Sequence, residues 1–300
     1  MKNRILLSLL TCGVLLAGCS KNEGGDLSEG GRTAIRLGSG VATVSKAAVT
    51  EGTSFTAGIA GWENTDTETY AQAPTWNTSI QTTANATTGQ NVTWTTQQYY
   101  NADGNTTTYM KAWYPAGTLS GTSVSFTNTD GSVDALLAPV VSGTKADKNN
   151  AKTLAFAHQT AQISFKVQAG DGLADNTTLS SITIKNVQLP TGFNLSTDVA
   201  TYASAADLTV PGITTGATTI SQTAAAVGNA VMIKPISGNT FTIDVVTNNA
   251  TYSNQTVTVN TDNIEAGTAY EVTLTFGQAG LSLKATVTAW NTGTGSAAIQ

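Results

Sequence analysis

The chain has 300 residues, a formal net charge of −5 and only 11% charged residues, against about 25% in a typical soluble domain. Its Lys and Arg residues form no cluster along the sequence, which argues against nucleic acid as a partner because phosphate binding needs concentrated positive charge. Both cysteines, Cys12 and Cys19, lie near the N-terminus, so the rest of the chain has no pair for a disulfide and no thiolate for metal binding or catalysis.

The first residues predict export from the cell. Two basic residues precede an apolar run that ends at Leu16; the run is too short to span a bilayer and is typical of a secretory signal. The segment Leu16-Ala17-Gly18-Cys19 resembles the lipobox of bacterial lipoproteins. We therefore expect residues 1–18 to be a signal peptide that is cut between Gly18 and Cys19, with lipid on the Cys19 thiol holding the chain to a membrane. The alternative is a plain signal peptide followed by an incidental cysteine.

Residues 19–32 are expected to form a flexible tether, because they are polar and rich in Gly. After the signal peptide the only arginines are Arg32 and Arg36, between this tether and the first expected strand. Trypsin-like proteases cut at basic residues in exposed, unfolded segments. Both arginines are therefore candidate processing sites.

From residue 33 onward the sequence predicts an all-β protein. Short runs of β-branched and aromatic residues alternate with Gly, Asn, Asp and Ser, a spacing that indicates antiparallel β-sandwich domains. The main runs are 55–59, 91–94, 109–114, 123–126, 162–167, 182–187, 231–233, 241–246, 256–259, 270–276 and 281–289.

A polar break at residues 142–150 divides the chain near its middle. Hydrophobic alternation resumes at Leu154 and Phe156, so we predict an N-terminal β-sandwich domain over 33–150 and a C-terminal one over 151–300.

The clearest strand pattern lies near the C-terminus. Apolar residues alternate with polar ones there, and a Gly-containing turn joins this run to 270–276 as an expected hairpin. The residues on the apolar face are Leu281, Leu283, Ala285, Val287 and Ala289.

Signs of catalysis or metal binding are weak. His158 is the one histidine, and the sequence offers neither a Gly-x-Ser-x-Gly motif nor a nearby Asp to complete a triad. The Cys and His sets that bind zinc are missing. Segments 101–104 and 128–134 are rich in oxygen ligands, but their Asn and Asp residues beside Gly are more typical of turns, and neither segment has the spacing of an EF-hand calcium loop. We expect no enzyme activity, no cofactor and no metal.

Two further residue groups have both a functional and a structural interpretation. A glycosidase needs paired carboxylates, but solvated loop positions are the simpler account of Glu51, Glu63, Asp66 and Glu68. A row of tryptophans suits either a sugar-stacking platform or a sandwich core; the four in the first half are Trp62, Trp76, Trp94 and Trp113.

Together these segments resemble the fimbrillin family, the lipoprotein-precursor pilins of type V pili. The similarity begins with the lipobox and extends over nearly the whole mature chain. The matching segments are Ala34-Ile35-Arg36-Leu37 to Ser45-Lys46-Ala47, Gly52 to Ile59, Ala112-Trp113-Tyr114-Pro115, Asp130-Gly131 to Asp134-Ala135-Leu136, Leu154-x-Phe156-x-His158-x-x-Ala161-x-Ile163-x-Phe165-x-Val167, and Val287-x-Ala289-Trp290.

The resemblance implies two transthyretin-like β-sandwich domains and assembly by donor-strand exchange. A protease removes the first strand of the N-terminal domain, and a strand of the next subunit fills the groove. Here the removable strand is expected over about 34–45, with apolar contacts from Ile35, Leu37, Val41 and Val44. The alternating C-terminal run from Leu281 to Ala289 is the candidate donor strand.

The expected cleavage site departs from the family pattern. Where the family carries arginine after the first strand, this chain has Lys46, and Arg32 and Arg36 precede the strand. Three possibilities follow: a lysine-tolerant protease cuts at Lys46, the strand leaves uncut, or the protein is an uncut member such as an anchor.

The resemblance also implies location and partners. We expect a pilus protein of the outer membrane and cell surface that assembles with other pilin subunits, contributes to adhesion and meets a glycan or protein receptor. The alternative is a non-polymerising surface lipoprotein or tip adhesin that binds glycans.

Overall fold

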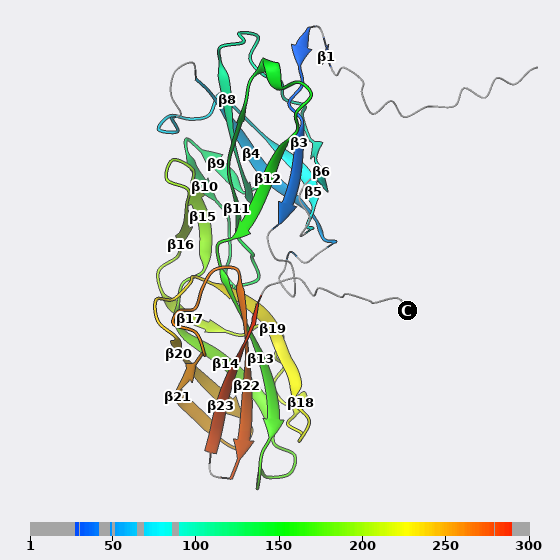
Figure 1. The fold of residues 1–300 in the computed structure, drawn as a ribbon. Coiled ribbons are helices and arrows are strands. Elements are labelled where there is room, and N and C mark those ends of the chain that lie inside the picture. The colour runs from blue at the N-terminus through cyan, green and yellow to red at the C-terminus, as the bar shows by residue number, and fades with distance from the viewer. Residues whose placement is uncertain are drawn as a thin grey trace, which may run out of the picture.

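The computed structural model describes residues 28–29, 31–41, 49, 52–64, 69–85, 90–278 and 280–289. These residues form an elongated molecule made of two β-sheet regions stacked end to end (Figure 1). The one helical segment among them is a short 3₁₀ turn, η1 (Lys145–Asp147). No helix in the described part of the chain has the length and apolar character needed to cross a bilayer. The all-β prediction with antiparallel sheets is confirmed, although two strand pairs, β3–β12 and β13–β22, are parallel.

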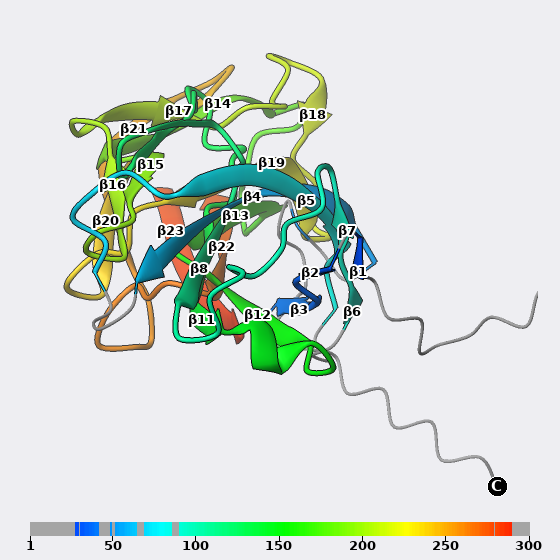
Figure 2. The same cartoon turned by 90° about the horizontal axis from the view of Figure 1, so that it is seen from above.

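The first region is one large sheet curled around its core. Val92 alone separates its two end strands, β6 and β7, along the chain, so the sheet nearly closes on itself (Figure 2). The strand order is β6 (Gln90–Asn91), β3 (Leu37–Val41), β12 (Lys152–His158), β11 (Leu136–Gly143), β8 (Thr107–Tyr114), β4 (Ser54–Asn64), β5 (Trp76–Thr83) and β7 (Thr93–Trp94).

The second region is a sandwich of two sheets. Alternating apolar residues of both sheets fill one core, among them Ile163, Phe165, Ile243 and Leu274, as expected for strands with one buried face. One sheet has the order β19 (Ala225–Ile233), β13 (Ala161–Ala169), β22 (Thr268–Gly277) and β23 (Gly280–Ala289). The other has β17 (Ala206–Thr209), β14 (Thr178–Val187), β20 (Thr240–Thr247) and β21 (Thr251–Thr258), with β18 (Thr218–Thr219) beside β14.

A smaller sheet joins the two halves of the sequence. Its order is β16 (Val199–Tyr202), β15 (Pro190–Asn194), β10 (Ser123–Ser125) and β9 (Thr118–Ser120). The β15–β16 hairpin packs Phe193 into a cluster with Trp62 and Trp113 of the first region. The buried Lys111 Nζ also donates to the Leu195 carbonyl at 2.8 Å and to Asp198 Oδ1 at 2.7 Å. This hairpin therefore fastens the second half of the sequence to the first. A last two-stranded pair, β1 (Ser28–Glu29) and β2 (Arg32–Thr33), precedes β3.

The first region ends after β12, one strand beyond the domain boundary that we expected near residue 150. β12 pairs with β11 and β3, and its Leu154 and Phe156 fill the first core. The polar break before it is an ordered turn: Thr144 N donates to Asp147 Oδ2 at 2.9 Å, and Lys152 Nζ lies 2.9 Å from Asp147 Oδ1. A composition typical of a linker thus belongs to the turn between β11 and β12.

Candidate assembly site

The first part of the site is β3 and the residues just before it. Ile35, Leu37 and Val41 are 1%, 8% and 1% exposed and lie in the core of the first region. All five residues of β3 are buried, and the Ser39 hydroxyl is hydrogen-bonded to the Thr82 hydroxyl. Three of the four predicted apolar contacts are therefore core residues, while Val44 lies outside the described residues.

The backbone of this segment has hydrogen-bonding partners on both sides. On one side β3 runs parallel to β12, from the Lys152↔Leu37 pair to the Phe156↔Val41 pair. On the other, Ile35 N donates to the Gln98 carbonyl at 2.9 Å and Val41 N to the Asn85 carbonyl at 3.0 Å. Removal of the segment would leave unpaired backbone groups along both walls of an apolar groove.

The predicted processing residues fall into two groups. Arg32 lies in β2, with its guanidinium 4.1 Å from the centre of the Tyr99 ring. The Arg36 carbonyl accepts a hydrogen bond from Lys152 N at 3.0 Å. Both arginines thus belong to hydrogen-bonded parts of the fold, whereas proteases need an unfolded segment. Lys46, and the lipidation and signal-cleavage residues Cys19 and Gly18, lie outside the described residues.

The second part of the site is the candidate donor strand. β23 pairs along its full length with β22, from Thr268↔Ala289 to Gly277↔Gly280, and it is an edge strand of its sheet. Leu281, Leu283, Ala285 and Val287 are only partly buried against the core of the second region. Figure 1 shows β23 beside β22, in the region that does not contain β3.

The tryptophans do not form a common platform. Trp62 and Trp113 are 3% and 2% exposed, and their indole N–H groups donate to the carbonyls of Gln72 and Ala116. Trp76 and Trp94 are partly buried and pack edge-on, with ring centres 6.1 Å apart. Trp62 and Trp113 are therefore core residues, as the simpler interpretation predicted.

His158 has a buried acidic partner that sequence reasoning missed. Its Nδ1 lies 2.9 Å from Asp134 Oδ1, and both side chains are fully buried. Burial, followed by the charge of Asp134, raises the pKa of the neighbouring Tyr114. Leu136 of β11 pairs with His158 of β12, and this register brings Asp134 close to His158. No local sequence motif predicts the register.

The other candidate acids have local roles where they are described. Glu63 accepts a hydrogen bond from Asn101 Nδ2 at 2.7 Å, and Glu51, Asp66 and Glu68 lie outside the described residues. Asp130 accepts hydrogen bonds from the backbone and hydroxyl of Ser132 within its turn. Within the described part of the chain, no group of three or more His, Cys, Asp or Glu residues is arranged to hold a metal ion.

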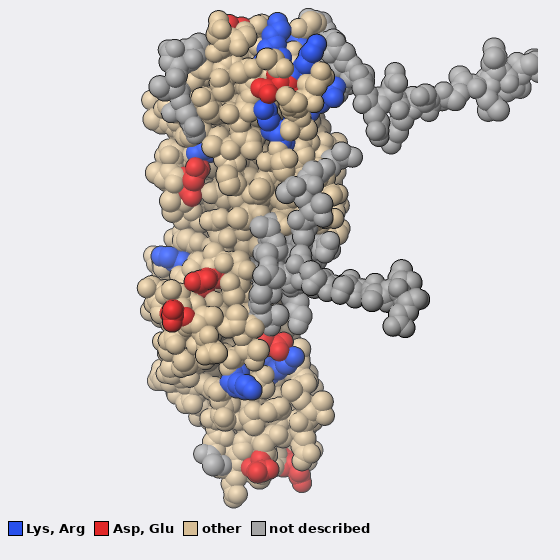
Figure 3. Space-filling view, in the orientation of Figure 1, with Lys and Arg blue, Asp and Glu red and all other residues tan. Residues whose placement is uncertain are grey.

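Charged side chains are sparse on the surface as well. On the face shown in Figure 3 they occur in small groups separated by broad uncharged areas, in keeping with 11% charged residues in the chain. Contacts with other molecules over most of this face would therefore use hydroxyl, amide and backbone groups.

A family model described as fimbrillin-like matches residues 45–290. The fold is also similar to solved structures. A candidate cell adhesion protein of Bacteroides uniformis matches with a TM-score of 0.57 at 17% identity, covering 88% of this chain and 100% of its own. A candidate cell adhesion protein of Bacteroides ovatus has a TM-score of 0.55 at 17% identity, with 87% and 99% coverage. A fimbrial protein of Bacteroides vulgatus has a TM-score of 0.55 at 14% identity, with 85% and 99% coverage. No curated protein sequence matches this chain significantly.

Proposed function

Because this chain belongs to the fimbrillin-like family, we propose that it is a structural, non-enzymatic subunit of a cell-surface pilus. It is exported as a lipoprotein anchored through Cys19 and assembles with other pilin subunits by exchange of β-strands. The observation that carries the proposal is the position of β3, a short buried strand with hydrogen-bonding partners on both sides. Full burial of an aliphatic side chain is worth about 1.5–3 kcal/mol, so the groove that β3 leaves has a strong tendency to bind another apolar strand.

The path of the chain supports a cut after Lys46 over a cut at either arginine. A cut at Arg32 or Arg36 would leave β3 joined to the rest of the first region, because both residues precede it. A cut after Lys46 would separate β3 from everything that follows and create a new N-terminus at Ala47. The match to the family begins at residue 45, just after β3, which fits a shared folded part that does not include this strand.

The side chains of the candidate donor strand match those of the strand that leaves. The segment before and within β3 reads Ile35, Leu37, Ser39 and Val41 at every second position. The core-facing side of β23 reads Leu281, Leu283, Ala285 and Val287. Both series have two large apolar residues, one small residue and then valine. In this register Ala285 takes the place of Ser39, beside Thr82.

The proposal is tested on protein sheared from the surface of its native cells. We expect mass spectrometry to find a mature N-terminus at Ala47, and unboiled gels to show a ladder of oligomers. Replacing Lys46 by Ala should abolish both. Replacing the exposed Lys148 by Ala is the matched control and should leave both intact.

Acylated Cys19 as the sole N-terminus, with monomers alone, would contradict assembly. That result would instead favour an anchored, uncut surface lipoprotein or adhesin.

A further inference from the structure

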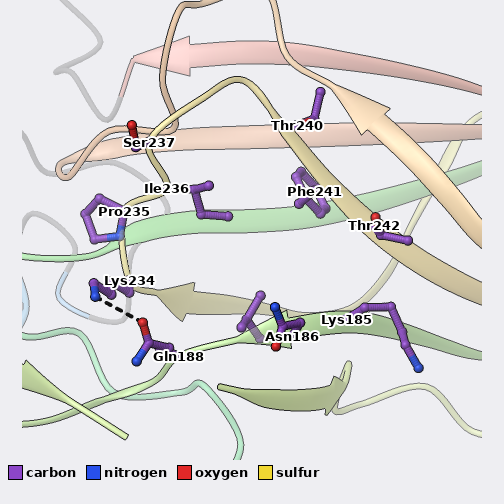
Figure 4. Close-up of a pocket in the computed structure, with 11 residues that line it drawn as sticks. Lys185, Asn186, Gln188, Lys234, Pro235, Ile236, Ser237, Thr240, Phe241 and Thr242 are labelled. Carbon is purple, nitrogen blue, oxygen red and sulfur yellow. Dashed lines mark hydrogen bonds between the residues drawn. The ribbon is translucent and has the colours of Figure 1, made fainter. Parts of the chain in front are cut away.

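The second region contains a pocket where two strands of one sheet part. β14 and β20 are paired as far as Ile184↔Ile243. β17 pairs with the other edge of β14, from Thr183↔Thr209 to Val187↔Ala206. Beyond Ile184 the β20 edge of β14 is open, and residues 240–242 of β20 have no partner on β14. The resulting cavity of about 510 Å³ falls within the range of about 300–1,000 Å³ that is usual for small-ligand sites. Figure 4 shows its lining side chains.

The lining suits a compact ligand rich in hydroxyl groups. Asn186, Gln188 and Thr242 bring amide and hydroxyl groups, while Phe241 and Ile236 supply an apolar part. The loop that contains Ile236 bounds one side of the cavity (Figure 4). Neutral polar groups beside an apolar patch match the hydroxyls and C–H face of a sugar ring.

A single lysine places a positive charge at one end of the pocket. The exposed Lys234 donates from Nζ to Gln188 Oε1 at 3.0 Å, and Nζ lies 5.3 Å from the centre of the Tyr202 ring. Gln188 is itself held in place, because its Nε2 donates to the Ala203 carbonyl at 2.8 Å. Among the ion pairs of the described residues, none includes Lys234. Its ammonium is therefore oriented and has no carboxylate to neutralise it.

The second lysine at the pocket is not available in this way. Lys185 Nζ is hydrogen-bonded to Asp207 and lies 3.3 Å from Asp244 Oδ2. These hydrogen bonds raise the pKa of Lys185. Figure 4 shows its side chain directed away from Lys234. Of the two lysines that line the pocket, Lys234 is the one left to bind an anion.

We propose that this pocket binds an acidic monosaccharide unit, such as a hexuronic acid at the end of a glycan. The carboxylate lies on Lys234, and ring hydroxyls bind to Gln188, Asn186 and Thr242. The proposal goes beyond assembly and needs only a folded second region. It assigns glycan recognition to the second region, whereas Trp62, Trp76, Trp94 and Trp113 lie in the first.

The test is a titration of the purified full-length protein, followed by NMR or calorimetry, with glucuronate, glucose and acetate as probes. Because Lys234 is exposed, its ion pair with a carboxylate is worth up to about 1 kcal/mol, so glucuronate should bind about 2- to 5-fold more tightly than glucose. Acetate should also bind more weakly, because it has no ring hydroxyls. Lys234→Gln should bring glucuronate to the affinity of glucose, whereas Lys234→Arg should retain most of the preference. Lys148→Gln, an exposed position in the first region, is the matched control for loss of one charge and should change nothing.

Three results would overturn the proposal: equal affinity for glucuronate and glucose, acetate binding as tightly as glucuronate, or no saturation by glucuronate below about 10 mM. Unchanged glucuronate affinity in Lys234→Gln would likewise show that Lys234 does not bind the carboxylate. None of these results depends on whether the protein forms pili.

Discussion

The segment 35–41, which contains β3, and the strand β23 have the same pattern of side chains, but they differ in burial and in the number of strands beside them. β3 lies between β6 and β12, and all five of its residues are buried. β23 has a single neighbour in its sheet, and its core-facing side chains from Leu281 to Val287 are partly buried. An interior strand costs far more to remove than an edge strand, because it takes two hydrogen-bond ladders and a section of core with it. On the proposed mechanism, β3 would therefore need a cut in the chain before it leaves, whereas β23 could leave its sheet uncut.

The largest effect is expected from placing a carboxylate in the segment that leads into β3 and another in β23. In the uncut protein Ile35→Asp puts a charge into a core where the side chain is 1% exposed. It should lower the free energy of unfolding by about 3–5 kcal/mol in urea titrations. Leu283→Asp replaces a partly buried edge residue and should cost about 1–2 kcal/mol.

Assembly should reverse the order of these two variants. Ile35 leaves with the cut strand, so Ile35→Asp subunits that fold and are cut should still polymerise. Leu283→Asp should block oligomer ladders, because the donor strand would carry a charge into the groove. Ser282→Asp, exposed on the same strand, is the control. Ladders from Leu283→Asp protein equal to those of the wild type would exclude β23 as the donor.

The sequence alone predicted features that depend on neighbouring residues better than features that depend on contacts between distant ones. The alternating run predicted over 281–289 is β23, Gly280–Ala289, and the run 241–246 lies within β20, Thr240–Thr247. The alternation of apolar and polar residues can be read from one stretch of sequence, so a strand can be predicted without knowing which strand it pairs with. Turn composition was less reliable: the polar break before β12, where we predicted a domain boundary, is an ordered turn between two strands of one sheet.

The features that the sequence did not predict depend on pairing between distant residues. Asp134 meets His158 through the β11–β12 ladder, and Phe193 reaches Trp113 through a hairpin that crosses between regions. The pocket lies where the pairing of β14 with β20 stops after Ile184. No local pattern contains these registers, so the candidate assembly strands were predictable from the sequence and the pocket was not.

A smaller effect should define the register of strand exchange. If Ala285 replaces Ser39, which is 1% exposed and hydrogen-bonded to Thr82, then Ala285→Leu overfills the groove at that point. Overpacking costs about 1–3 kcal/mol, or roughly 5- to 150-fold in the affinity of the strand. Oligomer yield against subunit concentration measures this. Thr286→Leu, exposed on the other face of β23, should assemble normally, and equal yields from both variants would rule out this register.

The smallest effect concerns Tyr100, which borders the removable strand. Its backbone N–H donates to the Thr33 carbonyl at 2.9 Å, and its hydroxyl is buried with no hydrogen-bond partner among the described residues. Burial, followed by the charge of Asp147, raises the pKa of Tyr100 from 10.0 to about 12. Because the folded-state pKa is the higher one, the unfolded chain releases this proton first. The contribution of Tyr100 to stability is thus complete below pH 10 and is lost as the pH rises towards 12.

The measurement for Tyr100 is urea unfolding of the uncut protein at pH 9 and pH 11. Tyr100 should account for a loss of about 1.4 kcal/mol between the two. Tyr100→Phe should be close to neutral at pH 9 and should lack that loss. Burial raises the pKa of Tyr202 to about 12 as well, and this residue is unchanged in the variant, so the difference between the two proteins isolates Tyr100.

Once β3 and the preceding residues are removed, the Thr33 carbonyl is gone and Tyr100 is less buried, so the difference between Tyr100→Phe and the wild type should shrink. A difference of the same size in cut and uncut subunits would mean that the wall of the groove keeps its structure without β3, which would weaken the case that an empty groove must be refilled.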